Sequence, residues 1–212
     1  MIKDNLLNLL ESIPDYVNLV AVSKTKPITN LLEAYEAGQR DFGENKVQDM
    51  ADKASELPQN IRWHMIGHLQ RNKVKYIAPF VSLIHSVDSI RLLTEIDKQG
   101  KKYNRVIDCL LQVRIAQEEK KFGLTFNSCS EIINQNNCTH VRIRGLMGMA
   151  SFTDNQAQVE SEFNSLAQFY KQHQEKYEWD TLSMGMSGDY PLALTCGSTM
   201  IRVGSLIFGE RK

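Results

Sequence analysis

The chain has 212 residues, and its 25 lysine and arginine residues balance its 25 aspartate and glutamate residues. A neutral chain has no overall field that attracts nucleic acid or an anionic membrane surface, so any basic site must be local. Its length and its hydrophobic fraction of 42% are sufficient for one well-buried core, and we expect a single domain over residues 1–212.

The N-terminal residues predict a helix and no targeting segment. Lys3, Asp4 and Glu11 interrupt the apolar core that a secretion signal needs, and no stretch of the chain approaches membrane-spanning length. We therefore expect a cytoplasmic protein that binds neither a membrane nor nucleic acid. An additional helix before the first strand is indicated by Leu6, Leu7, Leu9 and Leu10.

After this helix, short apolar runs alternate with helical patterns, which predicts an α/β fold. Eight such βα units within this length favour a (β/α)₈ barrel, although an open, doubly wound parallel sheet has the same alternation. The predicted strands are Val17–Val22, Asp41–Gly43, Trp63–Ile66, Leu83–His85, Val106–Val113, Val141–Met147, Thr181–Met184 and Met200–Val203.

Several helix starts are suggested by capping patterns. Asn30 and Ser128 are each followed three residues later by a glutamate, and Asp88 and Asp154 precede helical patterns. The helix after Asp154 has one apolar face, formed by Val159, Phe163, Leu166 and Tyr170. This face predicts packing against the core.

The four cysteines show neither zinc-ligand nor disulfide spacing. They have no C-x-x-C pairing, so we expect reduced, mostly buried thiols and neither a zinc site nor a disulfide framework. They are Cys109, Cys129, Cys138 and Cys196.

Lys24 is the most informative residue, because it follows the apolar run that forms the first predicted strand. In a barrel, residues at the carboxyl ends of the strands carry the chemistry. An amine beside Val20 and Val22 would be partly desolvated, which favours its neutral form, a nucleophile able to form a Schiff base with an aldehyde. A surface lysine at a strand exit is the alternative.

Other polar residues lie at the same end of different predicted strands. Arg202 alternates with Ile201 and Val203, so its guanidinium would point into a barrel and require an acceptor. Asn45 could cap the following helix or turn its amide toward a ligand. His64 lies within an apolar run, where it could be a hydrogen-bonded core residue or a site residue.

Small residues follow the seventh and eighth predicted strands. Ser187 and Gly188 form one turn, and Gly204 and Ser205 form the other. Small side chains let backbone N–H groups approach an anion, and the loops after strands 7 and 8 form the recurrent phosphate site of this fold. We therefore expect a phosphate between these loops.

Six motifs together resemble the YggS/PROSC family of pyridoxal phosphate homeostasis proteins. The resemblance covers nearly the whole chain in order. It rests on residues 21–27 (AVSKTKP), 42–45 (FGEN), 63–67 (WHMIG), 144–147 (RGLM), 182–187 (LSMGMS) and 197–204 (GSTMIRVG).

This resemblance implies a barrel of the alanine racemase type that binds pyridoxal 5′-phosphate (PLP). By motif position, Lys24 would be the Schiff-base lysine, and Arg202 would face the pyridine nitrogen. The implied phosphate cradle comprises Ser187, Gly204 and Ser205, and the implied pocket wall comprises Asn45, His64 and Met147. The chain departs from the family pattern at Arg114 and Gly188.

The chemistry of this arrangement favours a PLP carrier over an enzyme. Arginine only donates hydrogen bonds, so it favours an unprotonated pyridine ring, which is a poor electron sink. Racemases of the related type also need a second base, which the resemblance implies comes from a second domain, and we expect this chain to have no residues left to build one. We expect intracellular PLP buffering and delivery, possible transfer to PLP-requiring apoenzymes, and a monomer; a low-activity racemase and a PLP-free Schiff-base aldolase are the alternatives.

Overall fold

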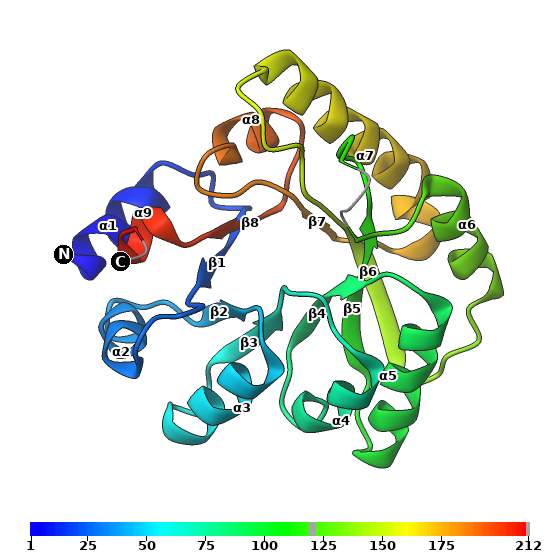
Figure 1. Cartoon of the computed structure of the whole chain (residues 1–212), viewed down its shortest axis with the longest axis horizontal. Helices are drawn as coiled ribbons and strands as arrows, with labels where there is room; N and C mark the ends of the chain where they lie inside the picture. Colours follow the sequence, from blue (N-terminus) through cyan, green and yellow to red (C-terminus); the bar gives the residue numbers. More distant parts are fainter. Residues whose placement is uncertain (119–121, 211–212) are drawn as a thin grey trace.

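The computed structural model describes residues 1–118 and 122–210 and has eight parallel strands closed into a barrel with the order β1-β2-β3-β4-β5-β6-β7-β8. Helices surround the ring of strands (Figure 1). The ring closes where β1 pairs with β8, with Val20 opposite Arg202 in the register. The predicted (β/α)₈ barrel is confirmed, and this last pairing excludes an open sheet.

Every predicted strand is present. The strands are β1 (Asn18–Val22), β2 (Asp41–Glu44), β3 (Arg62–Met65), β4 (Leu83–Val87), β5 (Ile107–Val113), β6 (Val141–Gly148), β7 (Thr181–Ser183) and β8 (Met200–Val203). The helices are α1 (Ile2–Glu11), α2 (Ile28–Glu36), α3 (Val47–Glu56), η1 (Arg71–Lys73), α4 (Val74–Ile77), α5 (Ile90–Lys102), α6 (Phe126–Gln135), α7 (Gln156–Tyr177), α8 (Tyr190–Thr195) and α9 (Ser205–Phe208).

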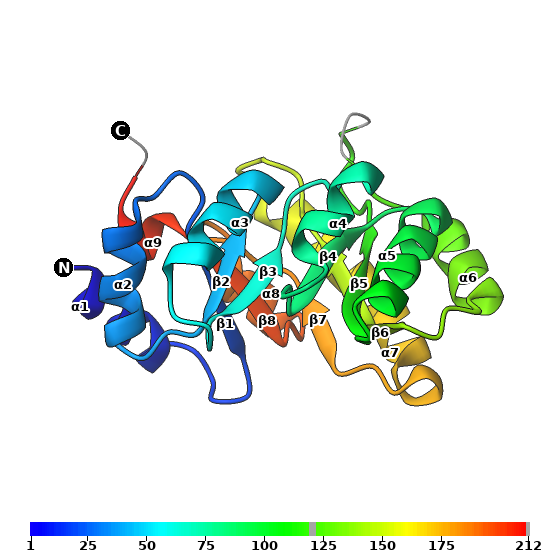
Figure 2. The same ribbon diagram turned by 90° about the horizontal axis from the view of Figure 1, so that it is seen from below.

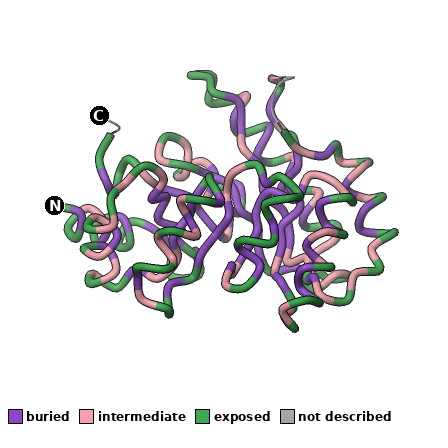
Figure 3. Tube along the Cα trace, turned by 60° about the horizontal axis from the view of Figure 1, so that its bottom comes forward, coloured by how far each residue is buried: buried purple, intermediate pink, exposed green. Residues whose placement is uncertain are grey.

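Two apolar cores result from the alternation of side chains along the strands. The larger core comprises residues of the strands and of the helices that surround them. Figure 2 shows these helices beside the strands, and Figure 3 shows buried residues concentrated along the chain in the interior. A smaller one fills the barrel interior and comprises Val20, Leu83, Leu110, Met147 and Met200. Ile201 and Val203 belong to the outer core, so the predicted inward orientation of Arg202 between them is confirmed.

Two helix starts lie one residue later than the capping pattern predicts. The hydroxyl of Ser89, not the carboxylate of Asp88, accepts the amide of Leu92 at the start of α5. At α7, Asn155 takes the place predicted for Asp154 and accepts the amide of Gln158. In both helices two adjacent residues can cap, and the one whose oxygen reaches the third helical amide does so.

The other two predicted caps lie inside their helices. Asn30 is in the first turn of α2, which follows Pro27 in an extended conformation. Ser128 is likewise in the first turn of α6, where Thr125 Oγ1 accepts its amide. Thr125 is therefore the N-cap of α6, and Ser128 is the residue three positions later whose amide is capped.

The first and last helices, α1 and α9, lie together at one side of the barrel (Figures 1 and 2). The predicted N-terminal helix α1 packs beside α9, and Asn5 Nδ2 donates to the carbonyl of Ile207 at 3.1 Å. Glu33 of α2 accepts the amides of Ile2 and Lys3 and so caps α1 from outside. Among the helices of residues 1–118 and 122–210, none has the length and apolar character required to span a membrane.

All four cysteines are free thiols, as predicted, and three of them are buried. Burial raises the pKa of the Cys129 thiol to about 12, so this side chain remains protonated and unreactive at neutral pH. We assign the cysteines to packing.

Gly145 lies where β6 shifts its register against β5, and its φ is +145°. A Cβ built there would lie 1.9 Å from the carbonyl oxygen of Thr181 on β7. We expect Gly145→Ala to reduce the free energy of unfolding by at least about 3 kcal/mol, because strain and a backbone clash add.

Gly38→Ala provides the control, because Gly38 also has positive φ (+107°) but an added Cβ meets nothing within 4 Å. This variant should lose only about 1 kcal/mol. Urea unfolding of both variants measures the difference. Equal losses would show that the contact with β7 is not the cause.

Candidate functional site

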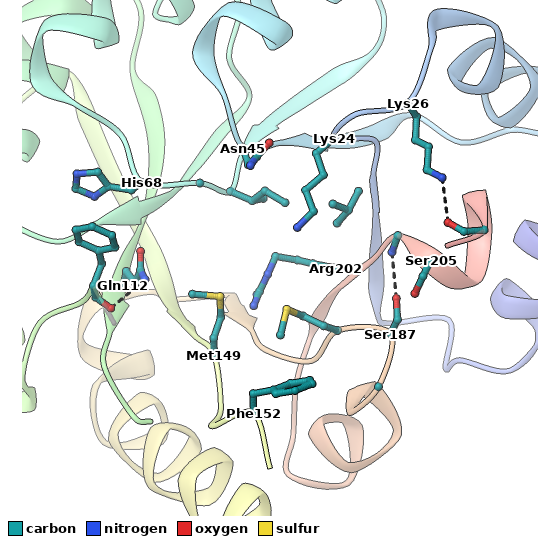
Figure 4. A pocket seen from close by; sticks show the side chains of 18 residues that line it. Lys24, Lys26, Asn45, His68, Gln112, Met149, Phe152, Ser187, Arg202 and Ser205 are labelled. Carbon is teal, nitrogen blue, oxygen red and sulfur yellow. Dashed lines mark hydrogen bonds between the residues drawn. The ribbon is translucent and has the colours of Figure 1, made fainter. Parts of the chain in front are cut away.

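A cavity of about 610 Å³ opens at the carboxyl ends of the strands. Six of the eight residues predicted for the site line it: Lys24, Asn45, Ser187, Arg202, Gly204 and Ser205. Figure 4 shows Lys24 and Arg202 extending into the same space, with Ser187 and Ser205 to one side and His68 and Gln112 to the other. Its volume lies in the range of small-molecule sites.

The backbone that carries Lys24 is held by a buried ion pair. Glu44 at the end of β2 is fully buried and accepts hydrogen bonds from Ser23 Oγ (2.6 Å) and Lys53 Nζ (2.7 Å). Lys53 Nζ also donates to the carbonyl of Ser23 at 2.9 Å. Thr25, on the other side of Lys24, has φ of +64°. These hydrogen bonds hold the backbone next to Lys24, and the half-buried side chain of Lys24 extends into the cavity.

Arg202 forms the floor of the cavity and is only 4% exposed. Its Nη1 donates to the carbonyl (2.8 Å) and hydroxyl (2.6 Å) oxygens of Ser183, and its Nη2 donates to the carbonyl of Gly148 at 3.1 Å. Burial lowers the pKa of Arg202 to about 10, while the charge of Asp189 opposes that shift. The guanidinium is therefore charged at neutral pH and fixed in orientation by protein acceptors.

The loops after β7 and β8 meet at the side of the cavity. The amide of Gly204 donates to Ser187 Oγ at 3.3 Å (Figure 4). A Cβ at Gly204 would lie 3.1 Å from the carbonyl oxygen of Val22, whereas Gly188 has open space around it. Asp189 Oδ1 accepts the amide of Met186 and holds the first of these turns. Small residues and hydroxyl donors thus border one corner of the cavity.

His64 and Met147 do not line the cavity, although the family resemblance implies that they do. Met147 belongs to the apolar core inside the barrel, and Met149, two residues later on the same face, reaches the cavity. His64 is 4% exposed, and its ring nitrogens contact His85 and Asp41, each at 2.9 Å. Both predicted residues therefore lie among the side chains inside the barrel.

Asp41 has an ionised carboxylate held by His64 and Arg62. Burial raises its pKa, but the hydrogen bonds from these two partners outweigh burial and lower it from 3.8 to about 2. Because the folded pKa lies below the ordinary value, this carboxylate stabilises the fold above about pH 4, and the contribution is lost as the pH falls through 2.

We therefore expect Asp41→Asn to cost about 2 kcal/mol of unfolding free energy at pH 7. Urea titrations of both proteins at pH 7 and at pH 2.5 measure this cost, and the difference between the proteins should shrink at the lower pH. A difference that does not change with pH would contradict the assigned ion pair.

Several cavity residues carry no sequence signal of their own. Phe122 is 58% exposed and stacks on His68 with ring centroids 4.1 Å apart, and Phe152 is 99% exposed. Gln112 Nε2 donates to the carbonyl of Phe122 at 3.2 Å. The two phenylalanines lie in loops without periodicity, so only Gln112, at the end of a strand, could have been identified by its position.

Lys26 binds the C-terminal segment. Its Nζ donates to the carbonyl oxygens of Phe208 (3.0 Å), Gly209 (3.0 Å) and Glu210 (3.2 Å). Cations are favoured at carbonyls that end a helix, here α9. Lys26 therefore closes the side of the cavity near Ser205.

The model of the family described as "Alanine racemase, N-terminal domain" matches residues 1–212. A protein of Pasteurella multocida named pyridoxal phosphate homeostasis protein is 37% identical over 202 residues, which cover 92% of this chain and 87% of the relative. The structure of PipY from Synechococcus elongatus PCC7942, with PLP bound, is 36% identical and has a TM-score of 0.91. The match covers 99% of this chain and 100% of the PipY chain. An alanine racemase of Clostridium difficile 630 shares the fold, with 12% identity, a TM-score of 0.78, and coverage of 99% of this chain and 56% of the racemase.

Proposed function

The chain belongs to the pyridoxal phosphate homeostasis proteins, a family built on the alanine racemase N-terminal domain, and we propose that its cavity binds PLP. One observation carries this proposal. The amine of Lys24 and the charged guanidinium of Arg202 extend into one cavity, next to the small-residue corner at Ser187 and Gly204. Lys24 matches the aldehyde of PLP, Arg202 matches its ring nitrogen, and the small-residue corner matches its phosphate.

The residues around the cavity fit the three polar parts of PLP. Lys24 Nζ adds to the aldehyde carbon, and a carbon–nitrogen double bond forms with loss of one water, which gives the Schiff base. The phosphate is held by the hydroxyls of Ser187 and Ser205 and by the amides at the start of α9, while the amide of Gly204 donates to Ser187 Oγ. Asn45 at the rim is a further polar contact for the ligand.

Arg202 determines what the bound PLP can do. When bound, PLP supplies an electron sink for carbanions beside its imine carbon, and a protonated pyridine ring strengthens that sink. Arg202 only donates hydrogen bonds, and its donors already hold two protein carbonyls, so it favours an unprotonated ring nitrogen. The site is therefore better suited to binding PLP than to catalysis with it.

We infer that the protein binds PLP reversibly, buffers its free concentration and delivers it to PLP-requiring apoenzymes. Amino-acid and keto-acid levels then respond indirectly. An imine is exchanged by hydrolysis or by transfer to another amine, so a half-exposed lysine in an open cavity suits this role. Under this proposal the protein acts as a monomer and residues 1–212 form one domain.

The visible spectrum of the purified protein tests the proposal. We expect a yellow absorption band, present on purification or after adding PLP, that disappears on borohydride reduction. Peptide mass mapping should then place the reduced label on Lys24. A protein that stays colourless and gains no band with PLP would contradict the proposal and would favour a PLP-free Schiff-base chemistry.

Exchange of the α-hydrogen of amino acids in deuterated water tests for racemase activity in the same sample. We expect a rate no higher than that of free PLP, because Arg202 disfavours the protonated ring. Exchange well above this background, abolished by Lys24→Ala, would identify a low-activity racemase.

A further inference from the structure

Five polar side chains from five strands are joined by hydrogen bonds across the barrel interior. Starting in the cavity, Arg202 Nη1 lies 2.6 Å from Ser183 Oγ, which lies 3.2 Å from His85 Nδ1. His85 Nε2 lies 2.9 Å from His64 Nδ1, and His64 Nε2 lies 2.9 Å from Asp41 Oδ1. The barrel relay, as we name it, comprises Arg202, Ser183, His85, His64 and Asp41, on strands β8, β7, β4, β3 and β2 (Figure 1).

The two ends of the barrel relay have fixed roles. Arg202 has only donors, so it donates to the hydroxyl of Ser183. At the other end, Arg62 donates to both oxygens of Asp41, which holds this carboxylate in its ionised, accepting form. The relay therefore begins at Arg202, which can only donate, and ends at Asp41, which can only accept.

The hydrogen positions between these ends follow step by step. Asp41 accepts, so His64 carries its hydrogen on Nε2, and the Nδ1 of a neutral His64 must accept. His85 then donates from Nε2, and its own Nδ1 accepts the hydroxyl hydrogen of Ser183. Ser183 finally accepts from Arg202. Every hydrogen bond in the relay points from the cavity toward Asp41.

The opposite direction leaves a defect inside the barrel. If His64 carried a second proton, His85 would accept at Nε2 and would donate from Nδ1 to Ser183. Ser183 Oγ would then accept from both His85 and the charged Arg202, and its own hydroxyl hydrogen would lose the acceptor that His85 Nδ1 provides. Burial is the main cause that holds the pKa of His85 well below 6.5, and the charge of Arg202 acts in the same direction, which agrees with a neutral ring.

We propose that the barrel relay is a one-way chain of hydrogen bonds that keeps both histidines neutral and orients Arg202 as a donor toward the cavity. Its four members other than Arg202 are positioning residues, since they act on the ligand only through the guanidinium. Under this proposal His64 acts on the site through His85, Ser183 and Arg202, although it does not line the cavity. The role of Arg202 toward the ligand rests on the proposed function; the direction of the relay does not.

Nitrogen NMR of the ligand-free protein, labelled with ¹⁵N-histidine, tests the direction. We expect His64 and His85 both to be neutral, with hydrogen on Nε2 and an unprotonated Nδ1. Asp41→Asn should move the nitrogen resonances of both rings, because the anionic acceptor that fixes the direction is lost. Hydrogen on Nδ1 of either ring, or a doubly protonated His64 at neutral pH, would overturn the proposal.

Asp108→Asn is the matched control for this experiment. Asp108 also pairs with arginines at a strand, at 2.7 Å from Arg142 and 3.3 Å from Arg144, but contacts no histidine. This variant should leave the resonances of both relay histidines unchanged. If the two aspartate variants shift these resonances equally, the relay does not carry the effect.

PLP titration of Ser183→Ala tests the positioning role. We expect roughly tenfold weaker PLP binding, as for loss of one charged hydrogen bond. Ser198→Ala is the control, because Ser198 is equally buried and its hydroxyl lies 2.7 Å from the carbonyl of Met184, outside the relay. Equal affinity in the two variants would refute positioning by Ser183. A wild-type protein that binds no PLP would instead refute the proposed function, and the NMR result would stand independently.

Discussion

Lys24→Ala is expected to abolish the visible absorption band and to weaken PLP binding by roughly a hundredfold, which corresponds to about 2.7 kcal/mol. The physical reason is that the covalent Schiff base is lost while the phosphate and ring contacts remain. Absorbance titration with PLP measures the affinity, and mass spectrometry after borohydride reduction should show no labelled chain. The fold should be unaffected, because the backbone at this position is held through Ser23, Glu44 and Lys53.

Lys26→Ala is the matched control, since Lys26 lines the same cavity but its amine binds the carbonyls that follow α9. We expect this variant to keep the band and the borohydride label, with a lower melting temperature. If Lys26→Ala also lost the label, the assignment of the Schiff base to Lys24 would be wrong.

Arg202→Leu should have the second largest effect, on both stability and binding. The substitution removes the charged donor from the carbonyls of Ser183 and Gly148 in the barrel interior, and buried acceptors left without a donor are costly. We expect a loss of about 4 kcal/mol in the free energy of unfolding and a melting temperature about 10 °C lower. The remaining folded protein should bind PLP at least tenfold more weakly.

Arg144→Leu provides the comparison, because Arg144 forms ion pairs with Asp108 and Asp180 but lies at the barrel surface. Partly exposed pairs of this kind contribute about 1 kcal/mol or less. Calorimetric melting of the two variants separates the effects. A similar fall in melting temperature for both would mean that the interior carbonyls do not depend on Arg202.

The strands and the main polar residues of the site could be predicted from the sequence because both depend on local order. Alternation with Ile201 and Val203 fixes the inward direction of Arg202, and the end of an apolar run fixes the position of Lys24. Closure of the barrel, in which β1 pairs with β8, then brings Lys24 and Arg202 to the same cavity.

The remainder depends on contacts between residues far apart in the chain. His64 contacts Asp41 and His85, and no periodicity links these positions across three strands. Phe122 and Phe152 reach the cavity from loops whose course is set by tertiary contacts. The exact start of a helix is also hard to predict from the sequence. At α5 and α7 two adjacent residues can each cap the helix, and the structure uses Ser89 and Asn155.

The pairing of β1 with β8 also bears on how the protein is made. Lys24 follows the first strand of the barrel, whereas Arg202 lies in the eighth strand, which pairs with the first. Contacts between residues so distant in sequence form only after the loop between them has been ordered. A nascent chain therefore cannot assemble the site before the eighth strand has been synthesised, and a ligand meets a complete site only in the closed barrel.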